Sequence, residues 1–230
     1  MLKIEELKAD YGTLNVLNNL SLKIETGTIH GLVGLNGSGK TTLLNTIYGI
    51  KKKAKGTILY NDIQINRHQM AYLETVNYFY PRITGYEYLQ ICSFNNKNFD
   101  INKWNALFEL SLEKLIDEYS TGMKKKLAFI AILALNREIL ILDEPFNGID
   151  LETVQKVKML LQQLKPDKTI LVTSHILESL TGICDHISYL NNGKIQFTKD
   201  NAEFDTIENE IFAVHHEKIS KQIKDLVGGH

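Results

Sequence analysis

The spacing of hydrophobic residues changes twice along the chain, and these changes predict a mixed α/β fold. Short runs that alternate between apolar and polar residues, or are wholly apolar, have the period of β-strands in the first third of the chain and again after residue 136. Between residues 75 and 136, apolar residues instead recur every three or four positions, and no convincing strand pattern appears. The pattern therefore predicts an α/β core that carries an inserted helical segment.

Individual elements follow from the same pattern. The predicted strands cover residues 2–8, 20–24, 29–33, 57–60, 71–74, 139–142, 169–174, 187–190, 194–198 and 210–215. The predicted helices cover residues 42–48, 84–94, 101–109, 122–135, 151–164 and 176–181, with one more in the tail around 219–227. We expect a single domain over residues 1–230, whose parts are an α/β core with a small antiparallel sheet (1–74 and 137–200), a helical subdomain (75–136) and a short C-terminal extension (201–230).

Composition narrows the class of partner. The 230 residues include 43% hydrophobic residues and carry a net charge of −1, which gives no basic surface for nucleic acid, so none is expected as a partner. The two cysteines, Cys92 and Cys184, are far apart and lack metal-ligand spacing, as is usual in a reducing compartment. No apolar run approaches the roughly 18 residues of a membrane span, and the charged start has no signal-peptide pattern, so a membrane role would require a partner.

The strongest local signal is a glycine-rich run that fits the phosphate-binding pattern G-x-x-x-x-G-K-[ST] and lies between a predicted strand and a predicted helix. Its glycines let backbone N–H groups turn toward phosphates at a helix N-terminus. Lys40 is predicted to contact the β- and γ-phosphates, Thr41 to bind Mg²⁺ and Thr42 to reach the α-phosphate. The predicted ATP-binding residues are Gly34, Leu35, Asn36, Gly37, Ser38, Gly39, Lys40, Thr41 and Thr42.

A second signal is the apolar strand at 139–142 that ends in Asp143 and Glu144. Such a strand delivers two carboxylates to the sheet edge beside the phosphates. We predict that Asp143 holds Mg²⁺ and that Glu144 orients or deprotonates the water that attacks the γ-phosphate. Acidic residues also end purely structural strands, so the assignment rests on the pairing with the glycine-rich run.

Residues 119–127 predict a helix N-terminus, with Ser120 and Thr121 as caps and Gly122 in the first turn. The segment also resembles the signature L-S-G-G-Q of the ATP-binding cassette (ABC) ATPases. Ser120 and Gly122 match it, whereas Tyr119, Thr121 and Met123 stand where that family has Leu, Gly and Gln. The resemblance covers nearly the whole chain, and the motifs occur in the family's order.

This resemblance implies roles for further residues. Tyr11 resembles the aromatic residue that stacks on adenine, although it is also a residue type common at strand ends. His175 resembles the switch histidine that contacts the γ-phosphate and braces Glu144, and Asp150 resembles the residue that contacts the partner subunit, although it can equally cap the following helix. The signature residues Ser120, Thr121, Gly122 and Met123 are implied to contact ATP bound to the other copy.

One departure concerns the glutamine that the family places near the start of its helical insert, where it touches Mg²⁺ and the attacking water. The best register puts Glu74 at this place as a catalytic and Mg²⁺-binding residue, with Gln69 as the competing register. A carboxylate still offers oxygen ligands, but it adds charge and cannot donate as an amide does. Just beyond it, residues 77–82 form an aromatic stretch that is predicted either to receive a helix of the membrane partner or to pack inside the helical lobe.

The resemblance implies a P-loop NTPase (RecA-like) core and an ATP-hydrolysing transporter subunit with ATP and Mg²⁺ as cofactors. Its expected partners are a second ABC ATPase subunit, forming a homodimer, and an integral membrane permease that holds it on the cytoplasmic face of the cell membrane. Residues 80–85 and 119–127 resemble exporters of drugs, peptides or ions. Two alternatives stay open: a soluble cassette of a cytosolic assembly, such as iron–sulfur cluster formation, and a nucleotide-dependent module that does not hydrolyse ATP.

Overall fold

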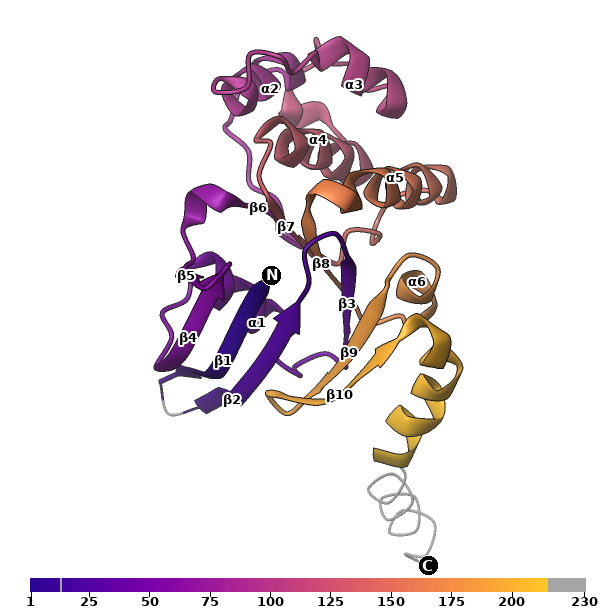
Figure 1. The fold of residues 1–230 in the computed structure, drawn as a ribbon. Helices are drawn as coiled ribbons and strands as arrows, with labels where there is room; N and C mark the ends of the chain where they lie inside the picture. Colours follow the sequence, from indigo (N-terminus) through magenta and orange to yellow (C-terminus); the bar gives the residue numbers. More distant parts are fainter. Residues whose placement is uncertain (13, 215–230) are drawn as a thin grey trace, which may run out of the picture.

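The computed structural model describes residues 1–12 and 14–214, and of Tyr11 it describes the backbone alone. Two β-sheets and a layer of helices make up this part of the chain (Figure 1). The strands are β1 (Leu2–Tyr11), β2 (Leu14–Ile24), β3 (Ile29–Val33), β4 (Lys55–Tyr60), β5 (Ile63–Gln64), β6 (Met70–Leu73), β7 (Ile139–Asp143), β8 (Thr169–Ser174), β9 (His186–Asn191) and β10 (Lys194–Asp200). The α-helices include α1 (Lys40–Tyr48), α2 (Gly85–Ser93), α3 (Ile101–Phe108), α4 (Thr121–Ala134), α5 (Leu151–Leu164) and α6 (Glu178–Thr181).

The larger sheet has the strand order β10-β9-β3-β8-β7-β6, and its strands from β9 to β6 run parallel. The three strands β3, β7 and β8 are buried along their whole length, because both faces of the sheet are covered. In β7, Leu140 and Leu142 pack with α4 and α5, whereas Ile139 and Ile141 pack with α1 and the small sheet. Parallel strands covered on both faces are the arrangement predicted for an α/β core, and this fold class is confirmed.

The smaller sheet is antiparallel, in the order β2-β1-β4-β5, and packs beside α1 at the left of Figure 1. Its first two strands are longer than the sequence pattern predicts. The register between them shifts after Ile4, after Leu7 and after Ala9, so that the apolar alternation is interrupted although pairing continues to Tyr11. Strand β5, only two residues long, has no usable periodicity and was not predicted.

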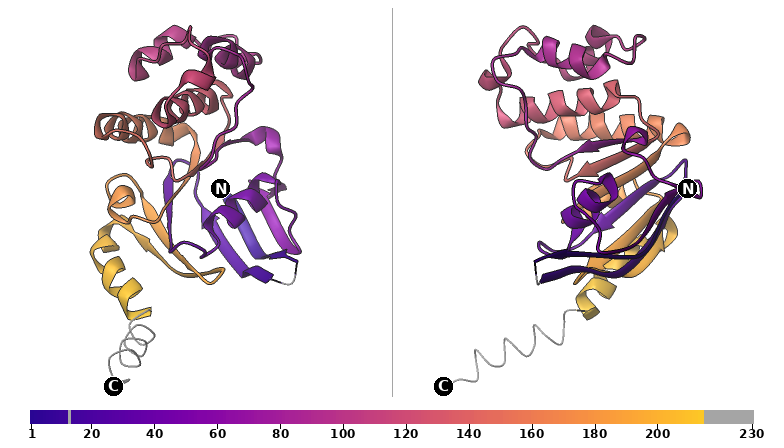
Figure 2. Two further views of the ribbon diagram at one scale, coloured as in Figure 1. Left: turned by 180° about the vertical axis from the view of Figure 1, so that it is seen from behind. Right: turned by 90° about the vertical axis from the view of Figure 1, so that its left-hand side faces the viewer.

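Helices α2, α3 and α4 lie between β6 and β7 in the chain and gather at one end of the molecule, on the side away from the small sheet (Figures 1 and 2). The side chains of Thr84, Asp100 and Ser120 each accept a hydrogen bond from a backbone N–H in the first turn of the following helix. These caps explain why the predicted boundaries at 84, 101 and 122 lie within one residue of the observed ones.

The prediction of a strand at 210–215 is wrong for the residues that the structure describes, because residues 207–214 are helical. Phe204 and Ile207 are buried, and Ile211 packs against the same cluster, so the apolar positions recur at three- and four-residue intervals. The predicted tail helix around 219–227 and His215 lie outside the described residues. Within residues 1–12 and 14–214, no helix has the length and apolar character needed to cross a membrane.

Candidate nucleotide site

The parallel strands β3, β6, β7 and β8 end at one edge of the large sheet, and the predicted site residues follow these ends. A cleft of about 550 Å³ opens at this edge. Strand β3 leads into the glycine-rich run, β7 ends at Asp143, and His175 follows β8. The cleft is lined by Leu14, Val16, Leu35, Asn36, Gly37, Gly39, Lys40, Thr41, Thr42, Thr75, Glu144, Asn147 and His175.

The glycine-rich run has the tight backbone expected of a loop that surrounds phosphates. Gly37 and Gly39 have φ angles of 81° and 109°, which side chains with a Cβ rarely adopt. A Cβ on Gly34 would lie 2.5 Å from the carbonyl oxygen of Leu190 and 2.6 Å from Ser38 Oγ. Gly39 lies at the start of α1, so the free N–H groups of the helix N-terminus face the cleft.

Lys40 carries the positive charge of the loop. Its Nζ donates to the carbonyl oxygen of Gly34 at 2.6 Å and lies 3.9 Å from Glu144 Oε1. Burial lowers the pKa of this amine, while the neighbouring carboxylates of Glu144 and Asp143 act in the opposite direction. An amine held beside the loop by its own carbonyl oxygens is positioned for the terminal phosphates of a nucleotide.

The carboxylate of Asp143 is fully buried and accepts hydrogen bonds from three hydroxyl groups. Thr41 and Thr75 each donate to Oδ2 at 2.9 Å, and Thr173 donates to Oδ1 at 2.6 Å. Carboxylate and hydroxyl oxygens are the ligands that Mg²⁺ prefers, and those of Asp143 and Thr41 converge beside Lys40. The donor set therefore fits a magnesium ion bound together with the phosphates.

Glu144 has a backbone φ of 51°, in the left-handed region, which costs about 1–3 kcal/mol for a residue other than glycine. Its backbone N–H donates to Thr173 Oγ1 at 3.0 Å. In its side chain, Oε2 accepts a hydrogen bond from Asn147 Nδ2 at 3.2 Å and lies 3.1 Å from His175 Nδ1. The strained backbone thus turns the carboxylate toward the cleft, where a water molecule beside the phosphates would lie.

The residue after β6 whose side chain lines the cleft is not the one singled out in the sequence. Strand β6 ends at Leu73, and neither Glu74 nor Gln69 is among the residues that line the cleft. Gln69 instead completes a capping box with Asn66. Thr75, one residue further, lines the cleft and donates a hydrogen bond to Asp143. The catalytic and Mg²⁺-binding role of Glu74 therefore stays a prediction, and Thr75 is a residue of the cleft that the sequence analysis did not single out.

The signature segment lies apart from this cleft. Ser120 caps α4 by accepting from the N–H of Met123 at 3.2 Å, and Ser120, Thr121, Gly122 and Met123 are absent from the cleft lining. Asp150 caps α5 through Thr153 and forms an ion pair with Lys126 at 3.1 Å. The hydrogen bonds from Thr153 hold the pKa of Asp150 well below its usual range.

The adenine end of the site is described in part. The side chain of Tyr11 lies outside the described residues, so its stacking role stays a prediction. Leu14 and Val16, in the first residues of β2, line the cleft with apolar atoms that the sequence analysis did not single out. Leu14 is 65% exposed.

Known proteins show the same combination of motifs and fold. Residues 17–147 match the family model described as ABC transporter. The chain is 34% identical over 210 residues to the ABC transporter ATP-binding protein YtrB of Bacillus subtilis, covering 87% of this chain and 72% of that protein. It is 29% identical to the lantibiotic transport ATP-binding protein SrtF of Streptococcus pyogenes, with 91% and 93% covered. This chain belongs to the ABC transporter family.

A solved structure of an ATP-binding subunit of an ABC transporter superposes with a TM-score of 0.81 at 26% identity, over 87% of this chain and 90% of that one. As an ABC cassette, the chain binds ATP and hydrolyses it to power transport. The cleft at the carboxyl edge of the large sheet is the place in the fold where its P-loop, Asp143 and Glu144 meet.

Proposed function

We propose that this cassette drives an exporter, with ATP held by residues 34–42 and hydrolysed by water that Glu144 activates. The observation that carries the assignment of roles is the convergence of Lys40, Glu144 and His175 on one cleft, where Glu144 lies within ion-pair distance of Lys40 and within hydrogen-bond distance of His175. Proton transfer to a positioned carboxylate contributes about 10²- to 10⁴-fold to a rate. Replacement of Glu144, described in the Discussion, tests this role.

The residues of the cleft divide the chemistry among them. Lys40 and the N–H groups of the loop bind the phosphates, and the Thr41 and Asp143 oxygens would hold Mg²⁺, which neutralises phosphate charge when bound. Glu144 accepts the proton of the attacking water. His175 holds the Glu144 carboxylate from its side, and Asn147 donates to the same oxygen, so that the other oxygen faces Lys40.

A second copy of the chain would complete the site. Ser120 and Thr121 are exposed, and with Gly122 they form the N-terminus of a 14-residue helix, which is suited to bind a phosphate, yet they do not reach the cleft of their own chain. Two copies related by a twofold axis would place each signature segment over the partner's ATP. ATP binding would then close the dimer, and hydrolysis would release it.

The loop between β6 and α2 offers a surface for a membrane subunit. Tyr78 and Tyr80 are 83% and 62% exposed, and Val76 is 61% exposed, whereas Phe79 packs edge-on against Tyr88 at 5.1 Å. Phe79 thus packs against the helical lobe, whereas its neighbours face outward. We propose that these outward side chains receive a cytoplasmic helix of the permease.

Replacing Tyr78 and Tyr80 together by alanine is expected to lower permease-stimulated ATPase activity about tenfold or more, because truncation of a buried aromatic anchor costs about 2 kcal/mol at an interface. The basal ATPase activity of the isolated cassette should stay within twofold. Ile63, 72% exposed on β5 and remote in sequence from this loop, gives the control substitution Ile63→Ala. Full stimulation by the permease in the double variant would remove this loop from the interface.

Export is the direction that we propose, with a peptide as the class of cargo. The support comes from SrtF, named for lantibiotic transport, and from the likeness of residues 80–85 and 119–127 to exporters. The protein would then lie on the cytoplasmic face of the cell membrane, held by its permease. Neither relative is named for a cytosolic assembly, so the alternative of iron–sulfur cluster formation is not favoured. ATP-dependent uptake into inside-out vesicles tests the direction, whereas uptake confined to right-side-out vesicles would indicate import.

A further inference from the structure

A run of charged residues usually forms a solvated face, but the three consecutive lysines of α4 have three different surroundings. Lys124 is partly exposed, and no hydrogen bond or ion pair is described for it. Lys126 is paired with Asp150. Lys125 is only 6% exposed, and its Nζ donates to the backbone carbonyl oxygen of Glu144 at 3.0 Å. Lys125 is therefore buried, unlike its two neighbours in the run.

A buried ammonium group is costly unless nearby groups compensate for the lost water. Burial lowers the pKa of Lys125, and the carboxylates of Asp143 and Glu144 act against this shift. The compensation comes from the catalytic edge of the sheet: one carbonyl oxygen as the hydrogen-bond acceptor and two carboxylates as the countercharge. A leucine at this position in the same packed helix could not donate this hydrogen bond or supply this charge.

The acceptor belongs to the residue whose backbone is strained. Glu144 has a φ of 51°, with its N–H held by Thr173 and its carbonyl oxygen held by Lys125. These two hydrogen bonds hold the backbone N–H and the backbone carbonyl oxygen of Glu144. Without the amine, the carbonyl oxygen of Glu144 would keep only the longer hydrogen bond from the backbone N–H of Asn147, at 3.3 Å. The peptide after Glu144 would then be held less firmly, which would let the carboxylate move away from His175.

We propose that Lys125 is a positioning residue for hydrolysis, which holds the backbone of Glu144 so that its carboxylate faces the attacking water. Lys125 lies on α4, five residues after Ser120 of the signature segment. Its hydrogen bond therefore also connects this helix to the backbone of Glu144, the residue with the catalytic carboxylate, in the same chain. This inference rests on the proposed role of Glu144. The strain at Glu144 and the contact with α4 are then parts of one arrangement.

The test compares Lys125→Met with Lys124→Met in the purified cassette. A displacement of about 1 Å in a catalytic group can cost about 100-fold in rate, so Lys125→Met is expected to lower kcat 10- to 100-fold while KM for ATP stays within threefold. Lys124→Met should keep both constants within twofold. Lys125→Arg, which retains charge and donors, should have a higher kcat than Lys125→Met. A kcat within twofold of wild type in Lys125→Met would overturn the proposal.

A double-mutant cycle separates positioning from a general structural role. In the Glu144→Gln background, Lys125→Met should cause no further loss of single-turnover hydrolysis, because the group that it positions is already absent. An equal loss in both backgrounds would overturn the proposal. Melting temperatures and ATP affinities of all variants show whether each is folded, and if Lys125→Met does not fold, Lys125→Leu takes its place with the same expected loss of kcat. If Glu144→Gln alone keeps wild-type turnover, the proposed role of Glu144 fails, whatever Lys125 does.

Discussion

Glu144→Gln is expected to lower the ATPase kcat by at least about 100-fold while leaving the affinity for ATP within about threefold of wild type. The amide has nearly the same shape as the carboxylate, but it cannot take a proton from the attacking water. Asn147 and His175 both contact one oxygen of Glu144, Oε2, and a glutamine can present an oxygen at this place, so these contacts should be kept. Steady-state hydrolysis and equilibrium binding of ATP measure the two effects separately.

A matched control is the same substitution at Glu152, an exposed residue in the first turn of α5 that pairs with Lys156. This variant should keep kcat and ATP affinity within twofold, since surface ion pairs contribute little. Turnover near wild type in Glu144→Gln would show that another group accepts the proton. A parallel loss of ATP binding would instead indicate that the substitution disrupts the cleft.

The second large effect is expected at Lys40, where Lys40→Ala should weaken ATP binding by at least about 100-fold. Each charge-assisted hydrogen bond contributes about 1.5–3 kcal/mol, and the ammonium group of Lys40 lies in the lining of the cleft. Its loss also leaves the carbonyl oxygen of Gly34 without the donor that it now has. Isothermal titration with ATP measures the change.

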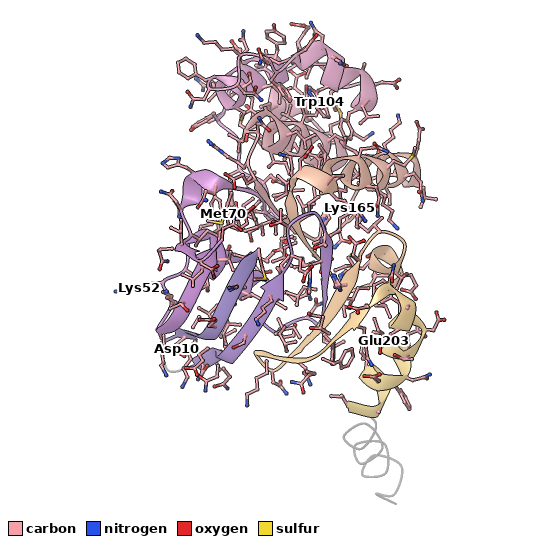
Figure 3. All side chains as sticks on the ribbon, in the orientation of Figure 1. Asp10, Lys52, Met70, Trp104, Lys165 and Glu203 are labelled. Carbon is pink, nitrogen blue, oxygen red and sulfur yellow. The ribbon has the colours of Figure 1, made fainter. Side chains whose placement is uncertain are left out.

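Lys52 provides the control for Lys40, because it is exposed and projects outward at the edge of the molecule in Figure 3. Lys52→Ala removes the same charge from the chain, so an effect of net charge alone would appear in both variants. We expect the ATP affinity of Lys52→Ala to stay within twofold. An equally small change in Lys40→Ala would contradict the assignment of Lys40 to the phosphates.

Much of the fold could be predicted because its signals are local. Strands β7 and β8 contain apolar runs and are buried because both faces of the sheet are covered. The end of β8 at Ser174 agrees with the prediction to the residue. The residues of the glycine-rich run follow one another along the chain, and so do the two carboxylates, so each motif can be recognised within a few residues. The boundaries of α2 and α4 follow from Thr84 and Ser120, whose capping role can be recognised in the sequence.

Residues that act through contacts between distant segments could not be found in this way. Thr75 bonds to Asp143 across 68 positions, and nothing in its neighbours distinguishes it from Glu74. Lys125 lies within a run of three lysines, and only its place on the buried side of α4 separates it from the others. The segment 210–215 is short and mixes apolar and polar residues, so its sequence pattern predicts a strand. The packing of Phe204, Ile207 and Ile211 against the core instead requires a helix.

The composite site is tested most directly by measuring the mass of the Glu144→Gln protein in solution by light scattering, first with ATP and then with ADP. If each signature segment completes the partner's site, ATP should convert the protein from one copy to two, and ADP should not. Introducing Ser120→Arg into the same variant should prevent dimer formation while ATP still binds, because Ser120 is absent from the chain's own cleft. A Glu144→Gln protein that binds ATP fully and remains a single copy would contradict the composite site.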